Sequence, residues 1–277
     1  MEGNSMTIRE AIDMIISHHA PLRSDDTVDT IKCGYPEDEL TGIVTTCCAS
    51  VAVIREAIRL GANLIVTHEP VFYSHPDDVD ELEGQNSTYD AKRALCDENR
   101  ITIWRDHDHM HTDTPDSIMV GMVKALGWEQ YYEGDLSQLR FSPAMFCLPD
   151  MKLCDVAEHI KKCFQLKAVR CVGDPECVVR KACFFAHIMA GDGDMEAIRL
   201  MNREDIDLLI PGEVIDWTCA SAVRDAAQLG KNKAMLIMGH FNLEEPGMIH
   251  AADMINHIFN GGVKVTFVRS GDMYFYL

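Results

Sequence analysis

Short apolar segments alternate with amphipathic segments along almost the whole chain, and this alternation is what most restricts its fold. Apolar residues at helical spacing indicate helices, and short apolar runs between turn residues indicate buried strands. The expected strands are 43–46, 63–67, 101–105, 167–172, 180–189, 207–211, 234–238, 263–268 and a short last one at 273–277. The expected helices are 7–18, 50–61, 88–99, 115–127, 152–164, one starting at 195, 216–229 and 248–259. Strands that alternate with helices favour α/β layers with mostly parallel sheets.

A short internal repeat suggests that the pattern of helices and strands is duplicated. The pentapeptide EAIRL occurs at Glu56–Leu60 and again at Glu196–Leu200, and each copy leads through a turn into an apolar strand. A glutamate follows each strand, Glu69 in the first copy and Glu213 in the second. We therefore predict an α/β fold of two related, three-layer-like halves with mixed, mostly parallel sheets. The expected domains are 1–127 plus 245–277, and 128–244.

Charge and cysteine content exclude several classes of protein. The formal net charge is −19, which repels phosphate backbones and argues against a nucleic-acid partner. No apolar run approaches the ~20 residues that span a bilayer, and the amphipathic N-terminus with internal acids is unlike a signal peptide. The 11 cysteines are odd in number and form no CxxC pair. These features predict a reduced, cytoplasmic protein without a membrane partner.

Side chains that bind metals follow three of the expected strands. In open α/β sheets, ligands collect beyond the carboxyl ends of the strands, where neighbouring loops meet. The candidates are His68 and Glu69 after LIVT, His107, His109 and His111 after ITIW, and His240 and Glu244 after AMLIMG. We expect these groups to form a metal site in the cleft between the two halves.

The geometry of two of these motifs depends on the local backbone. If the chain stays extended past Arg105, His107, His109 and His111 face one side and form a wall of imidazoles. His240 and Glu244 are four residues apart and share a face if a helical turn begins there.

Simpler interpretations of the single residues stand beside this one. A histidine at a strand end, such as His68, is commonly a surface or hydrogen-bonded residue, and HxxxE pairs are common on exposed helices. Glu213 after Gly212 also suits a helix N-terminus. Asp192 and Asp194, which lie between and after glycines, suit a turn.

Imidazoles combined with carboxylates suit Zn, Mn, Fe or Co better than calcium. The number of candidate groups exceeds the needs of one tetrahedral ion, so two divalent transition-metal ions are expected. Other chemistries lack their motifs: there is no phosphate-binding loop, no GxGxxG after a strand and no GxSxG elbow. Cys47 or Cys48 remains a conceivable nucleophile, although no neighbouring residue marks either thiol as activated.

The motifs resemble the NIF-three-like dinuclear-metal family, also labelled GTP cyclohydrolase type 2-like, over nearly the whole chain. The resemblance rests on MTIREAIDMIISHHAP, GIVTTCCASVAVIREAIRLGANLIVTHEPVFY, VGDPECVVRKACF, DIDLLIPGEVIDW and IMGHFNLEEPG. It implies that His68 and Glu69 occupy the two histidine positions of the family's His-His-Pro motif. It also implies that His240 and Glu244 are ligands of the closing motif.

The middle motif departs from the family pattern of His-Thr followed by a bridging aspartate. His107 is the best counterpart of the histidine, and His111 falls at the aspartate position. A shift of one residue would instead place Asp108 or His109 there. Where the family pattern has a histidine this chain has Glu69, and where the pattern has an aspartate this chain has a histidine near 111. The two changes keep a similar number of imidazole and carboxylate donors but alter which metal binds where.

Two functions fit this resemblance. One is a metal-dependent hydrolase of a small molecule, nucleotide-like or a cyclic amide, in which the ions activate water. Glu244 would be essential for turnover, and Glu213 or a spare histidine would shuttle protons. The other is a metal-binding or regulatory interaction protein without turnover. The resemblance also implies a homo-oligomer, a hexamer or trimer of dimers.

Overall fold

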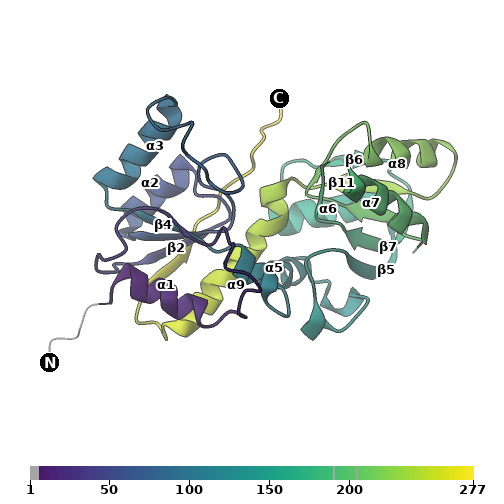
Figure 1. Cartoon of the computed structure of the whole chain (residues 1–277). Helices are drawn as coiled ribbons and strands as arrows, with labels where there is room; N and C mark the ends of the chain where they lie inside the picture. The colour runs from purple at the N-terminus through teal and green to yellow at the C-terminus, as the bar shows by residue number, and fades with distance from the viewer. Residues whose placement is uncertain (1–5, 190, 204) are drawn as a thin grey trace. The chain divides into compact units, whose positions relative to one another are not determined.

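The computed structural model describes residues 6–189, 191–203 and 205–277 (Figure 1). Its helices are α1 (Ile8–Ile16), α2 (Val51–Leu60), α3 (Ser87–Glu98), α4 (Asp108–Thr112), α5 (Ser117–Leu126), α6 (Leu153–Phe164), α7 (Asp192–Arg203), α8 (Cys219–Gln228) and α9 (His240–Ile258), with single 3-10 turns η1 (Glu129–Tyr131) and η2 (Leu136–Gln138). Its strands are β1 (Ile31–Cys33), β2 (Ile43–Thr46), β3 (Leu64–Thr67), β4 (Thr102–Arg105), β5 (Ala144–Lys152), β6 (Arg170–Val172), β7 (Val178–Phe184), β8 (His187–Ile188), β9 (Leu208–Ile210), β10 (Glu213–Val214), β11 (Ala234–Ile237) and β12 (Val265–Phe267).

The chain divides into two compact units. Unit 1 contains residues up to Ile118 and Gly247–Ser270, and unit 2 contains Met119–Pro246 and Gly271–Leu277. No helix in the described ranges is both long enough and apolar enough to cross a membrane.

The sheet of unit 1 has the strand order β1-β4-β3-β2-β12. The strands β12, β2, β3 and β4 run parallel, and β1 pairs antiparallel with β4 at the edge. Every residue of β2, β3 and β4 is buried, as expected for parallel strands covered on both faces. The register places Thr67 opposite Arg105, so β3 and β4 end side by side and their following residues start from neighbouring positions.

Alternate residues of these strands face different layers. Val44, Ile65 and Ile103 pack in one cluster with residues of α2 and α3, on the face that Figure 1 shows covered by these two helices. Thr45 points to the other face, where its hydroxyl donates to the carbonyl of Met248 in α9 at 2.9 Å. The period of two along each strand therefore places helices on both faces, which gives the three layers predicted from the sequence.

The sheet of unit 2 repeats the order of the first. Its strands follow β6-β11-β9-β7-β5, in which β11, β9 and β7 are parallel and β6 pairs antiparallel with β11 at the edge. The difference lies at the last strand, because β5 is antiparallel to β7 whereas β12 is parallel to β2. A separate parallel pair joins β8 to β10. The prediction of two related α/β halves with mixed, mostly parallel sheets is confirmed.

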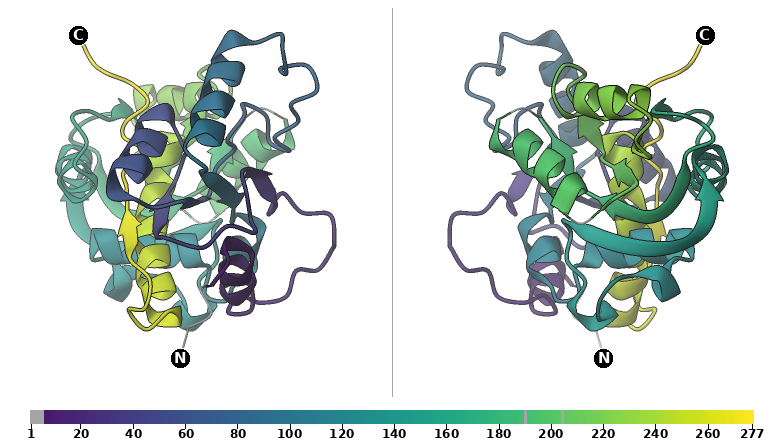
Figure 2. Two further views of the ribbon diagram at one scale, coloured as in Figure 1. Left: turned by 90° about the vertical axis from the view of Figure 1, so that its left-hand side faces the viewer. Right: turned by 90° about the vertical axis from the view of Figure 1, so that its right-hand side faces the viewer.

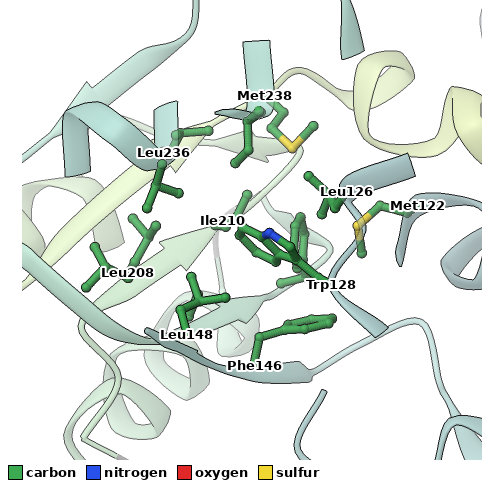
Figure 3. Packing of buried hydrophobic residues seen from close by; sticks show 14 of the residues in the cluster. Met122, Leu126, Trp128, Phe146, Leu148, Leu208, Ile210, Leu236 and Met238 are labelled. Atoms are coloured by element: carbon green, nitrogen blue, oxygen red, sulfur yellow. The ribbon is translucent and has the colours of Figure 1, made fainter. Parts of the chain in front are cut away.

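The core of unit 2 also has two faces. Leu208, Ile210 and Leu236 pack with Phe146 and Trp128 in a buried cluster that Figure 3 shows from close by. The residues between them in sequence, such as Leu209 and Met235, belong instead to a second cluster that contains residues of α7 and α8. The alternation of apolar residues along β9 and β11 therefore builds the cores on both sides of the sheet.

Three expectations about local structure are wrong. Residues 273–277 form no strand, and Met273, Tyr274 and Phe275 there are exposed. The helix expected over 248–259 begins earlier, at His240, and includes Pro246. Asp192 and Asp194 lie in the first turn of α7 rather than in an open turn, because acidic residues also stabilise a helix N-terminus.

Two long loops of unit 1 carry residues of the candidate metal centres. The loop between α1 and β1 and the loop between β3 and α3 both extend from the body of unit 1, as the left view of Figure 2 shows. The first contains His19 and Asp29, and the second begins at His68.

Candidate metal centres

Three histidines of unit 1 meet beyond the carboxyl ends of β3 and β4. His68 follows β3 directly, His107 lies two residues beyond β4, and His111 lies on α4. The ring centroids of His68 and His107 are 4.6 Å apart, and the centroid of His111 lies 4.9 Å and 4.8 Å from these two. One ring nitrogen from each lies within 4.8 Å of the others. We call this group the histidine cluster.

The backbone after β4 is helical, so the prediction of an extended wall of three imidazoles is wrong. His107 is the N-cap of α4 and lies one turn before His111, whose N–H donates to the carbonyl of His107 at 3.1 Å. His109 therefore faces another direction and meets Asp29. Asp29 explains the local helix, because its carboxylate accepts the N–H groups of residues 107, 108 and 109 at 2.7–2.9 Å.

Each ring of the histidine cluster is held through its Nδ1 atom. Nδ1 of His68 lies 3.1 Å from the carbonyl oxygen of Asp106, Nδ1 of His107 lies 2.8 Å from Asp108, and Nδ1 of His111 lies 2.9 Å from Asp116. Oxygen acceptors at Nδ1 place the proton there and leave the lone pair on Nε2. Metal-binding histidines have this arrangement, in which an outer carboxylate or carbonyl fixes the ring and its tautomer.

Electrostatics in the cluster favour a neutral imidazole at His107. Burial, together with the neighbouring His111, lowers the pKa of His107. Burial of Asp108 acts to raise its pKa, but hydrogen bonds from Thr27 and His107 dominate and bring that pKa down to about 2. Asp108 therefore stays a carboxylate that accepts from His107, so the imidazole can be neutral, as a metal ligand must be.

A buried guanidinium supports the loop that carries His68. Arg105 Nε donates to the carbonyl of His68 at 2.9 Å, and its Nη1 donates to the carbonyl of His75. Asp77 lies 3.6 Å from Arg105 and accepts the N–H groups of Val71 and Phe72 at 2.7 Å and 2.6 Å. The loop after β3 is thus fixed from inside the protein, which keeps His68 at the strand end.

A second group gathers in unit 2 and consists of His187 on β8 and His240 and Glu244 on the first turn of α9. Nε2 of His187 and Nε2 of His240 lie 3.2 Å and 3.3 Å from the two carboxylate oxygens of Glu244, which is buried. The two rings stack with centroids 3.9 Å apart. The helical turn that brings His240 beside Glu244 is the one the four-residue spacing suggested. We call this group the histidine–glutamate cluster.

Glu213 lies behind this cluster. Its carboxylate is 3.2 Å from Nδ1 of His240 and 3.8 Å from Nδ1 of His187, and the hydrogen bond with His240 lowers the pKa of Glu213. Gly212 makes room for the ring of His187, because a Cβ there would lie 3.2 Å from the ring atoms Cε1 and Nδ1. Glu213 thus lies on a strand and orients His240, which replaces the alternative that it simply opens a helix.

A cavity of about 340 Å³ opens beside the histidine–glutamate cluster. The residues that line it include Glu213 and His240, the aromatic residues Phe241 and Tyr274, and Arg170. A volume of this size is at the lower end of the range of small-molecule sites. The combination offers one cation and two rings to a ligand.

The remaining predicted site residues lie apart from these two groups or at their margin. The carboxylate of Glu69 is 3.9 Å from Nε2 of His68 and is almost fully buried. His109 lies on the other side of α4 with Asp29 and Asp106, so it does not share the wall predicted for it.

His187 was missed in the sequence because it sits inside an apolar segment that predicts only a strand. Its one signal was its place near the end of that strand, the position that singled out the other histidines.

The fold and these clusters define the class: a protein of two α/β units with His, Asp and Glu groups that could bind metal ions. The chain belongs to the Duf34/NIF3 (NGG1p interacting factor 3) family, whose model matches residues 6–272. The resemblance found in the sequence is therefore confirmed.

Relatives and solved structures agree with this family. A protein of Clostridium perfringens named GTP cyclohydrolase 1 type 2 homolog is 25% identical over 262 residues, which cover 90% of this chain and 92% of that protein. A hypothetical protein of Staphylococcus aureus has the same fold with a TM-score of 0.73 and 17% identity, covering 99% of this chain and 100% of the other. A Bacillus cereus protein related to NIF3 matches with a TM-score of 0.71 and 15% identity at the same coverage.

Proposed function

We propose that this protein binds two divalent transition-metal ions, one at the histidine cluster and one at the histidine–glutamate cluster, and hydrolyses a small molecule. The observation that carries the proposal is the orientation of the rings. Nδ1 of His107, His111 and His240 each faces a carboxylate, which is the outer partner that orients metal-binding histidines. When bound, such ions lower the pKa of water and polarise a carbonyl or phosphoryl oxygen.

The protein's own groups supply the rest of the chemistry. Glu213 holds His240 through Nδ1 and is partly exposed toward the cavity, so it is placed to take a proton from a substrate or water. Glu244 is buried between His187 and His240 and provides the negative charge of its cluster.

The cavity supports a nucleotide-like or cyclic amide substrate. Phe241 and Tyr274 offer flat apolar surfaces to a planar ring, and Arg170 offers a planar cation to a phosphate or carboxylate. A single small ligand that carries a planar ring and an anionic group would use both the aromatic residues and Arg170.

Two experiments, done one after the other, test the proposal: the first measures metal content and the second measures turnover. The purified full-length chain, loaded with Zn²⁺ or Mn²⁺ and dialysed, is expected to retain about two equivalents by elemental analysis. The loaded protein is then assayed against nucleotides, phosphoesters and cyclic amides. Exchange coupling between two Mn²⁺ ions in EPR spectra tests the dinuclear arrangement that the family resemblance implies.

Glu244→Gln is the decisive variant. It removes the negative charge of the histidine–glutamate cluster at constant side-chain size and is expected to lower turnover by at least about 100-fold. His257→Ala is the matched control, because His257 is an exposed histidine on the same helix. Tight metal retention without turnover on any substrate class would favour a metal-binding or regulatory protein, and a chain that retains no metal would contradict both functions.

A further inference from the structure

A third group of potential ligands lies behind α4, on the side away from the histidine cluster. It consists of Asp29, Asp106 and His109, all buried, with one ligand atom from each within 4.8 Å of the others. Asp106 contacts both the histidine cluster and this third group. Its backbone carbonyl accepts from His68, and its side chain points to the third group.

Among the residues that the structure describes, no hydrogen-bond donor faces one oxygen of this group. The side chain of Asp106 is fully buried, and within the described part of the chain its Oδ1 atom makes no hydrogen bond, whereas Oδ2 lies 3.2 Å from Nε2 of His19. A buried carboxylate oxygen that is left without a donor has lost its hydration and gained no hydrogen bond in return, so such an atom needs an explanation.

The imidazole of His109 is held like those of the histidine cluster. Its Nδ1 lies 2.7 Å from Oδ2 of Asp29, which leaves the lone pair on Nε2. Asp29 itself is fixed by the backbone N–H groups at the start of α4. This is the carboxylate–histidine pairing that orients rings toward metal ions.

The charge of the group is negative. Both ring nitrogens of His19 face carboxylate oxygens, of Asp106 at 3.2 Å and of Asp113 at 2.8 Å, so His19 acts as a single imidazolium shared between two carboxylates. Asp29 adds a third carboxylate. The nearby ammonium of Lys32 is paired with Asp77 at 3.3 Å. Buried carboxylates in excess of their partners require a cation or a proton.

We propose that Asp106, His109 and Asp29 form a further binding site for a divalent cation, distinct from the two clusters above. Asp106 and His109 are its main ligands, and Asp29 contributes a carboxylate oxygen while orienting His109. Two carboxylates with one imidazole suit Mn²⁺, whereas the all-imidazole histidine cluster suits Zn²⁺.

The test uses the full-length chain with the two other clusters removed. A His107→Ala, His111→Ala, His240→Ala background, stripped with a chelator and dialysed against Mn²⁺, is expected to retain about one equivalent by elemental analysis. Because this background lacks the clusters of the proposed function, the result does not depend on that function. Absence of a bound ion in a background that folds would overturn the site.

Ligand variants in that background locate the ion. Asp106→Asn is expected to remove it, and His109→Gln serves as a second variant should Asp106→Asn not fold. The matched control is Asp113→Asn, which removes the same charge from the other side of His19 and is expected to keep the ion. Retention of the full equivalent in a folded Asp106→Asn or His109→Gln variant would show a buried ion-pair network in which a proton balances Asp106.

Discussion

The two clusters hold their rings in different ways. In unit 1, three imidazoles are each tied at Nδ1, and the partner of His111, Asp116, is itself buried. In unit 2, two imidazoles share one buried carboxylate, Glu244, and the carboxylate behind His240 is Glu213, whose side chain is 42% exposed. The carboxylate that orients His111 is therefore enclosed, whereas the carboxylate that orients His240 is partly solvated. Since buried hydrogen bonds to charged groups are worth more than solvated ones, the two should respond differently to loss of their outer carboxylates.

The largest expected effect is the loss of a ligand. His107→Ala and His240→Ala are each expected to remove about one equivalent of metal, from the histidine cluster and the histidine–glutamate cluster respectively, because a three-donor set that loses one donor binds far more weakly. Elemental analysis after dialysis measures this. His257→Ala should keep the full content. If either single variant released all the metal, the two clusters could not be treated as separate sites.

Removal of the outer carboxylates should distinguish the clusters more sharply. Asp116→Asn is expected to weaken binding at the histidine cluster by about 10- to 100-fold, the usual effect of losing such a partner. Glu213→Gln should weaken the histidine–glutamate cluster by less than about tenfold, because its carboxylate is partly solvated. Competition with a chromogenic chelator gives both affinities. Equal losses would contradict the contrast drawn above.

The sequence was sufficient for most of the fold because its signals are local, although the edge strands β1 and β5 were not expected. The apolar runs of β2, β3 and β4 and the spacing of α2 require only neighbouring residues to interpret. The relation between the halves followed from EAIRL and the matching order of elements, and the two sheets do share their strand order. Strand ends also indicated His68, His107 and His240, since parallel strands end at a common edge.

The parts that the sequence did not reveal depend on contacts between distant residues. The stretch from His107 to His111 has no strong helical signal, and it is helical because Asp29, about 80 residues earlier, caps it. The same carboxylate turns His109 away from His107. His187 joins Glu244 across 57 residues. Spacing along the chain does not encode such pairings, so the ligand sets needed the coordinates.

A smaller effect should follow from Gly212→Ala, which tests whether the ring of His187 needs the space that a glycine leaves beside it. The added Cβ would lie 3.2 Å from the ring and 3.3 Å from Leu243, so His187 must shift by a few tenths of an ångström. We expect an affinity loss of about two- to fivefold at the histidine–glutamate cluster and none at the histidine cluster. Gly193→Ala is the control, because no described residue lies within 4 Å of a Cβ there. An unchanged affinity would place His187 outside the ligand set.

The smallest expected effect concerns Arg170, which lines the cavity but is 59% exposed and only 3.9 Å from Asp216. A solvated cation contributes little to binding, so Arg170→Ala should raise KM for anionic substrates by about three- to tenfold and change kcat less. Arg180→Ala is the matched control, since Arg180 is an exposed arginine of unit 2 that pairs with Asp150. Because only an anionic substrate gains from the guanidinium, neutral analogues should be unaffected. A rise in KM for neutral and anionic compounds alike would mean that Arg170 shapes the cavity rather than recognising charge.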